Sequence, residues 1–175
     1  MWKVAYKSIW AFVAVVLAAI LISNIAHAAA GRHAPLGYQL MCLNNPGECR
    51  GGGAPRVAAS NEIMATLKRV NSQINRSIRP KADGQVDVWS ANGNVGDCED
   101  YVLAKRRLLI RAGIPPSSLR IAFVKTKSGI SHAILVVITE RGKLVLDNLT
   151  ATIRPLGQTG YRVVSMQSAD PQSWS

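Results

Sequence analysis

The chain has 175 residues, of which 21 are basic and 10 are acidic, and a formal net charge of +11. A chain of this length accommodates one domain with an extension, which excludes a large multidomain protein. With 48% hydrophobic residues it is too apolar to be disordered. Its three cysteines are too few for a scaffold held together by disulfides, and their odd number leaves at least one thiol unpaired within the chain.

The first 28 residues have the pattern of a secretory signal peptide. Lys3 and Lys7 precede an apolar run of 14 residues, Ile9 to Ile22, and Ala26-His27-Ala28 supplies a small-x-small cleavage site. The run is short for a membrane-spanning helix, which needs about 20 apolar residues, and an uncleaved anchor is the alternative. We therefore expect a periplasmic or secreted protein, cleaved after Ala28, that contacts a membrane only if this segment is retained. Cleavage would lower the formal charge from +11 to +9, and because the basic residues are not interleaved with aromatic ones, we expect no nucleic-acid partner.

Residues 29–59 are rich in Gly, Pro and Ala, which predicts an irregular arm. The arm contains Cys42 and Cys49, which can form a disulfide in an oxidising compartment. Closing so short a loop would stabilise the fold by about 2.5 kcal/mol at best. A metal site is the alternative, with His33 as the additional ligand.

Residues 60–175 predict a single domain that begins with two helices. The first starts at Ser60 or Asn61 and runs to about Ile78, because its apolar residues recur at spacings of three and four. The second starts near Asp97 and ends at Ala112. Its predicted inner stripe consists of Cys98, Tyr101, Val102, Leu108, Leu109 and Ala112, with the Lys105 amine reaching out to solvent.

Four strands are predicted after the second helix, over residues 119–125, 131–139, 143–148 and 161–165. Helices followed by strands indicate the α+β class, with the helices packed on an antiparallel sheet.

Cys98 lies where a thiol can become reactive. It follows Gly96-Asp97 at the start of the second predicted helix, where free backbone N–H groups stabilise a thiolate and lower its pKa. The same N–H groups can donate to an oxyanion. If Cys42 and Cys49 pair, Cys98 is the remaining thiol. A buried structural cysteine is the alternative.

A thiolate nucleophile needs a base, and the base needs a residue that orients it. His132 begins one predicted strand and Asp147 lies near the end of the next, where a carboxylate is costly unless it has a partner. If Ile138 opposes Lys143 across a four-residue loop, His132 and Asp147 share a face with Cβ atoms about 7 Å apart. A two-residue loop, Arg141-Gly142, would place them two steps apart. A Cys-His-Asp triad therefore requires the longer loop or a bulge.

Three segments together resemble the bacterial transglutaminase-like cysteine peptidase family (BTLCP). Residues 96–101 (GDCEDY), with Lys105 and with residues 112–115 (AGIP), are similar to the family's nucleophile helix. Residues 131–135 (SHAIL) and 145–149 (VLDNL) resemble its histidine and aspartate strands, in the same order, and Trp89 also fits. The resemblance covers about residues 61–161. It implies a papain-like, transglutaminase-like fold with the cysteine helix packed on an antiparallel sheet.

The resemblance implies a cysteine endopeptidase that works by acyl transfer. Cys98 would attack a peptide carbonyl, His132 would act first as base and then as acid, and Asp147 would orient His132. LapG-type members of the family are periplasmic proteases that cleave surface adhesins, which suggests a cell-surface protein as substrate. An inner-membrane receptor sequesters those members, so a regulatory receptor is a partner by analogy. The alternatives are transglutaminase or deamidase chemistry on the same triad, and a non-catalytic exported binding module.

The resemblance also bears on the acids around the cysteine and on the cleft. The adhesin-cleaving members require calcium, and their ligand positions carry over to Asp97 and Glu99. The alternative is that these acids complement the helix dipole without binding an ion. Trp89 is a candidate to line the substrate cleft, with a position in the core as the alternative.

Overall fold

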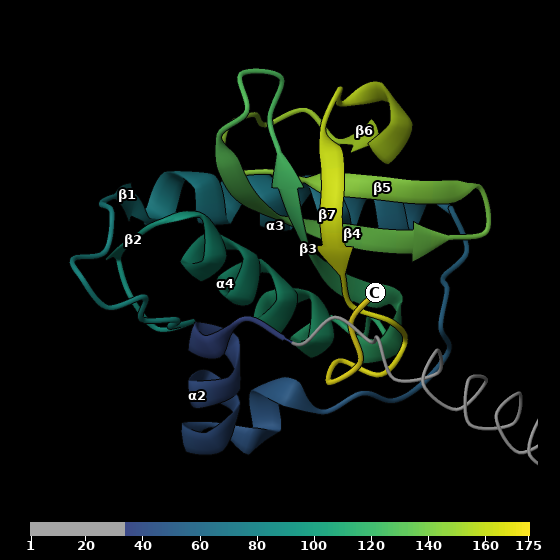
Figure 1. Ribbon diagram of the computed structural model, residues 1–175. Coiled ribbons are helices and arrows are strands. Elements are labelled where there is room, and N and C mark those ends of the chain that lie inside the picture. The colour runs from purple at the N-terminus through teal and green to yellow at the C-terminus, as the bar shows by residue number, and fades with distance from the viewer. Residues whose placement is uncertain (1–33) are drawn as a thin grey trace, which may run out of the picture. The chain divides into compact units, whose positions relative to one another are not determined.

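The computed structural model describes residues 34–175, so the predicted signal peptide and His33 lie outside the described residues. A five-stranded antiparallel sheet has the strand order β6-β5-β4-β3-β7 (Figure 1). Its strands are β3 (Leu119–Lys125), β4 (Ser131–Thr139), β5 (Gly142–Leu146), β6 (Arg154–Pro155) and β7 (Arg162–Met166). The first two predicted strands have the predicted bounds, and the other two are shifted by one or two residues.

Two helices precede the sheet, α3 (Asn61–Ser77) and α4 (Cys98–Arg111). Ser60 caps α3, since its hydroxyl oxygen accepts the N–H of Ile63 at 3.2 Å. Each helix starts and ends within one residue of the limits predicted from the sequence. Across residues 34–175, every helix is too short or too polar to cross a membrane.

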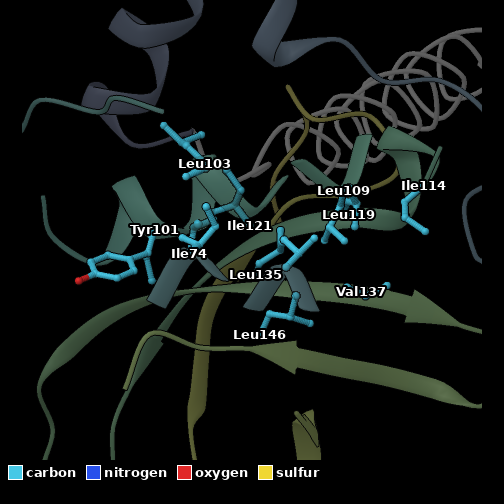
Figure 2. Packing of buried hydrophobic residues seen from close by; sticks show 14 of the residues in the cluster. Ile74, Tyr101, Leu103, Leu109, Ile114, Leu119, Ile121, Leu135, Val137 and Leu146 are labelled. Carbon is cyan, nitrogen blue, oxygen red and sulfur yellow. The ribbon is translucent and has the colours of Figure 1, made fainter. Parts of the chain in front are cut away.

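The two helices pack against one face of the sheet. Side chains of α3 and α4 such as Ile74, Leu103 and Leu109 share a buried cluster with Ile121 and Leu135 of the sheet (Figure 2). Successive strand residues point to opposite faces, and the alternate residues Ala122, Val124, Ile134, Val136 and Val145 form a second, smaller cluster. The α+β class and the packing of the cysteine helix on an antiparallel sheet are therefore confirmed.

The hairpin of β4 and β5 has the register that the triad requires. Ile138 pairs with Lys143, and Leu135 pairs with Leu146. The ends of the expected four-residue loop, Thr139 and Gly142, also pair with each other. The turn itself therefore consists of Glu140 and Arg141, and the expected register is kept. The alternative loop, Arg141-Gly142, is excluded.

The prediction of an irregular arm was wrong for part of residues 29–59. Helix α2 (Leu36–Asn44) and the short 3₁₀ helix η1 (Pro46–Cys49) lie there, and Tyr38 and Met41 of α2 are buried in the same core as α3 and α4. The predicted Cys42–Cys49 disulfide is present, with Cα atoms 5.6 Å apart. Helix α2 was not predicted because Gly and Pro residues surround it in the sequence. The burial of its apolar side chains depends on residues far along the chain.

Lys105 was expected to reach solvent, and this was wrong. Both Lys105 and the neighbouring Arg106 are fully buried in α4, whereas Ala112 is exposed. Arg106 donates to the carbonyl oxygens of Glu48 at 2.5 Å and Arg50 at 3.2 Å. A buried guanidinium that binds backbone carbonyls thus attaches the disulfide-containing segment to α4.

Four shorter elements complete the chain. Strands β1 (Arg79–Pro80) and β2 (Val95–Gly96) pair in parallel and bring the start of α4 next to the end of α3. The 3₁₀ helices are η2 (Pro116–Ser118), before β3, and η3 (Leu156–Gln158), before β7.

Candidate active site

The N-terminus of α4 positions Cys98. Asp97 and Asp100 form a capping box there, in which the N–H of Asp97 donates to Oδ2 of Asp100 at 3.3 Å. A Cβ atom on Gly96 would collide with the Asp100 carboxylate, so the capping box can form only with glycine at this position. Cys98 is the first residue of the helix and the free cysteine of the chain.

The Cys98 sulfur makes two hydrogen bonds. It accepts the N–H of Ala133 in β4 at 3.3 Å, and its thiol donates to Oε2 of Glu99 at 3.1 Å. Burial, followed by the neighbouring Glu99, raises the pKa of the Cys98 thiol to about 12. In this arrangement the sulfur is a thiol beside β4, next to the residue that carries the imidazole.

His132 and Asp147 form a buried pair. Nε2 of His132 lies 2.8 Å from Oδ1 of Asp147. The structure therefore brings these two predicted residues into direct contact, and it brings Cys98 against the backbone of Ala133. The hydrogen bonds of the Cys98 sulfur within residues 34–175 go to Glu99 and Ala133 rather than to the His132 ring.

Two further groups hold the Asp147 carboxylate. The hydroxyl of Tyr161 donates to Oδ2 at 2.6 Å, and the N–H of Leu149 donates to Oδ1 at 3.0 Å. Burial alone would raise the pKa of Asp147, but hydrogen bonds from His132, Tyr161 and Leu149 outweigh it and lower that pKa. The carboxylate is thus held in its ionised form, as an orienting residue must be.

Tyr161 and Asn75 were missed by the sequence analysis. The Tyr161 ring meets the His132 ring edge-on, with centroids 5.9 Å apart. Asn75 of α3 donates its amide to the backbone oxygen of Asp147 at 2.9 Å. One turn earlier on α3, Asn71 donates to the carbonyl oxygen of Ala151 at 3.2 Å. The sequence signal for these contacts was the spacing of four residues between Asn71 and Asn75, which places two polar side chains on the otherwise apolar, inward face of α3.

A group of carboxylates lies beside the cysteine. Oxygen atoms of Asp83, Asp87 and Glu99 lie within 4.8 Å of one another. Asp97 adjoins this group, since its Oδ2 accepts the N–H of Asp83 at 3.4 Å. Burial, together with hydrogen bonds to Asp87 and Asp97, raises the pKa of Glu99 to about 9. Asp97 and Glu99 were predicted from the sequence as ligands, whereas Asp83 and Asp87 of the preceding loop were not.

Trp89 occupies the position in the core that was the alternative to lining the substrate cleft. Its side chain is buried in the main core, where its ring packs edge-on against Tyr38, with centroids 5.5 Å apart, and is tilted against Phe123. Its Nε1–H donates to Oδ2 of Asp87 at 3.0 Å. Trp89 therefore anchors the acidic loop to the core.

Together these features define a class of protein. A free cysteine begins a helix that packs on an antiparallel sheet, and an imidazole–carboxylate pair comes from the adjoining strands. This is the arrangement of a papain-like, transglutaminase-like cysteine protease.

The chain belongs to the bacterial transglutaminase-like cysteine proteinase family (BTLCP), whose model matches residues 28–175. It is similar to solved structures of Legionella pneumophila LapG. The calcium-bound form is 25% identical with a TM-score of 0.55, and the match covers 61% of this chain and 66% of that chain. For the EGTA-treated form the identity is 25%, the TM-score 0.55 and the coverage 61% and 64%. The chain thus spans just under two thirds of the LapG chains that it matches, and no curated protein sequence matches it significantly.

Proposed function

We propose that this cysteine protease works through Cys98, His132 and Asp147. The observation that carries the proposal is the buried 2.8 Å contact between His132 and Asp147, one residue from the backbone N–H that touches the Cys98 sulfur. Asp147 binds Nε2 of the ring, so Nδ1 remains for the thiol proton. The proposal requires the Cys98 side chain to turn from Glu99 toward Nδ1 of His132 before its proton can be transferred.

The reaction follows from these roles. The Cys98 sulfur forms a bond to the carbonyl carbon of a peptide while His132 takes the thiol proton. The C–N bond then breaks, and His132 passes the proton to the leaving amine. Water attacks the thioester with His132 as base, which releases the carboxylic acid and restores the thiol. The Cys98 N–H, at the start of α4, is the proposed donor to the oxyanion.

Labelling of the purified protein with a thiol-directed probe tests the triad. Because Cys98 is the free cysteine, Cys98→Ala should abolish labelling. His132→Ala should slow it by tenfold or more at neutral pH, since the base that accepts the thiol proton is gone. Equal labelling rates in wild type and His132→Ala would overturn the assigned role of His132.

The acidic group fits a calcium ion. Hard cations prefer carboxylate oxygens, and Asp83, Asp87 and Glu99 supply three of them within 4.8 Å. None of these carboxylates has a basic partner in the part of the chain that is described, and Oδ1 of Asp97 is buried without a hydrogen-bond partner. When bound, calcium would neutralise the carboxylates beside the nucleophile and hold the loop that precedes α4. The calcium-bound form of LapG supports this proposal.

Thermal unfolding with calcium or with EGTA tests the ion site. Calcium should raise the melting temperature of the wild type, because an ion that binds only the folded state stabilises it. The shift should disappear in Asp83→Asn and Glu99→Gln, and it should persist in Asp170→Asn, whose side chain lies outside the group. A calcium shift that survives Glu99→Gln would contradict the assignment.

The protein is proposed to act on protein substrates outside the cytoplasm, with cell-surface proteins as the class. The signal-peptide pattern of residues 1–28 and the Cys42–Cys49 disulfide support an oxidising compartment. Comparison of the surface proteins shed by wild-type cells and by a Cys98→Ala strain tests this. Surface proteins retained only in the Cys98→Ala strain are the expected result, and identical shedding would contradict it.

A further inference from the structure

A groove borders the catalytic pair on the side of His132. It has a volume of about 580 Å³. Its lining includes His132 and Tyr161, the loop between β3 and β4 with Lys127 and Ile130, and Leu149 from the segment after β5. Figure 1 shows that the β3–β4 loop and the start of β7, which follows Tyr161, lie at the same end of the sheet.

The position of the groove relative to the catalytic groups fixes which part of a substrate it can hold. Its lining includes His132 but not Cys98. The imidazole must contact the leaving nitrogen to protonate it, whereas the acyl part of the substrate is bonded to the sulfur. A substrate segment that lies in the groove and contacts His132 is therefore the segment that follows the scissile bond.

The chemistry of the walls indicates the side chain that fits. Ile130 and Leu149 are 65% and 64% exposed although both are large and apolar. They come from different loops and line the same groove, so an apolar side chain between them would cover both.

Lys127 is the cationic residue of this lining, and among residues 34–175 it has no acidic partner. Its side chain lies across Gly160, so closely that a Cβ atom there would displace it. The lining contains no carboxylate among the described residues, so an acidic substrate residue would meet an unopposed positive charge.

The geometry points to a leaving-side subsite that selects an apolar residue directly after the scissile bond, held between Ile130 and Leu149, with an acidic residue close behind it at Lys127. This inference rests on the proposed function and deepens it by naming the sequence class that is cleaved.

The test is cleavage of a synthetic library of random-sequence peptides by the purified protein, with the cut bonds identified by mass spectrometry. Wild type should cut about tenfold more often before leucine or isoleucine than before serine, as expected for an apolar contact of this size. In Ile130→Ser and Leu149→Ser this preference should fall to about twofold or less. Lys127→Glu should replace the acidic preference with a basic one while the apolar preference remains.

Two control variants, and the pattern of results, distinguish failure of the subsite from failure of the peptidase function. Leu43→Ser removes a leucine on α2 that is 78% exposed, and Lys143→Glu reverses a charge outside the groove. Neither should change the preferences. Two results would overturn the subsite alone. One is cleavage with no preference for apolar residues directly after the cut bond. The other is a preference for them that Ile130→Ser and Leu149→Ser leave unchanged. No cleavage of any peptide by a wild type that still labels at Cys98 would overturn the peptidase function and the subsite with it.

Discussion

The hydroxyl of Tyr161 donates to Oδ2 of Asp147 at 2.6 Å, on the opposite oxygen from His132. Tyr161 precedes β7, whereas Asp147 follows β5, and the two strands lie on opposite sides of β4 and β3 in the sheet. The orientation of the His132 imidazole therefore depends on contacts from across the sheet as well as on the β4–β5 hairpin.

Tyr161→Phe should lower kcat by roughly tenfold, which corresponds to about 1.4 kcal/mol of transition-state stabilisation. Without the hydroxyl, the pKa of Asp147 rises, so the acid limb of kcat/KM should move to higher pH. The lowered pKa of Asp147 also stabilises the folded state above its unfolded-state value of 3.8, and this stability is lost as the pH falls through the folded-state value. In Tyr161→Phe this contribution should be smaller, and its loss should be complete at a higher pH than in wild type.

Tyr101→Phe is the matched control for this prediction. It removes a hydroxyl that donates to the carbonyl oxygen of Ile78 at 2.6 Å, away from the catalytic pair. It should lower the unfolding free energy by about 1 kcal/mol and leave the pH profile unchanged. A pH profile of Tyr161→Phe that matches wild type would contradict the orienting role of Tyr161.

The two asparagines of α3 should differ in their effect on catalysis. Asn75 binds the backbone oxygen of Asp147 itself, whereas Asn71 binds only Thr150 and Ala151. Each change to alanine should cost about 1–2 kcal/mol of unfolding free energy. Asn75→Ala should in addition lower kcat severalfold with little change in KM, because Asp147 is less well fixed. Equal kcat values for Asn71→Ala and Asn75→Ala would contradict this distinction.

Replacement of the buried Lys105 should stabilise the protein. Burial lowers the pKa of its amine to about 7, although the charge of Asp147 opposes this, and the amine has no hydrogen-bond partner. The unfolded chain therefore binds more protons than the folded one between pH 7 and the ordinary lysine pKa of 10.5, so this residue makes the unfolding free energy rise with pH across that window.

Lys105→Met keeps the length of the side chain and removes the charge. It should raise the unfolding free energy at pH 7 by about 1–4 kcal/mol, with a gain that shrinks toward pH 10. Urea denaturation at several pH values measures the difference between the two proteins. Lys143→Met, at an exposed position of β5, is the control and should change little. A gain that stays constant with pH would rule out titration of Lys105 as its source.

The disulfide of the N-terminal segment should affect stability more than chemistry. The double change Cys42→Ser and Cys49→Ser should lower the unfolding free energy by about 2.5 kcal/mol. Cys98 labelling should continue at the wild-type rate, because Arg106 still binds the carbonyl oxygens of Glu48 and Arg50. Reductant should lower the stability of wild type to that of the variant and leave the variant unaffected. Loss of labelling in the variant would show that the disulfide positions the nucleophile.

Much of the fold was readable from local patterns. The stripe of apolar residues in α3, its Ser60 cap and the apolar runs of β3 and β4 fix these elements within short stretches of chain. The contact of His132 with Asp147 was predicted only conditionally, because it depends on the register of one hairpin, for which the sequence left two alternatives. Helix α2 could not be predicted in the same way, because it is stabilised by contacts with residues far along the chain.

The rest of the candidate site also depends on long-range packing. Tyr161 reaches Asp147 only because β7 pairs with β3, which no local pattern specifies. Asp83 and Asp87 join Glu99 because Trp89 is buried and fixes their loop. The burial of Lys105 was missed since a lysine on a helix ordinarily extends its amine to water.

The glycine in front of the capping box has a consequence for mutational screens. Any side chain at Gly96 would occupy the space of the Asp100 carboxylate, so even an alanine there would displace the first turn that carries the sulfur. Random mutagenesis scored for loss of activity should therefore identify position 96 as often as each of the three triad positions. Gly96 would be found there although it has no side chain that could take part in proton transfer.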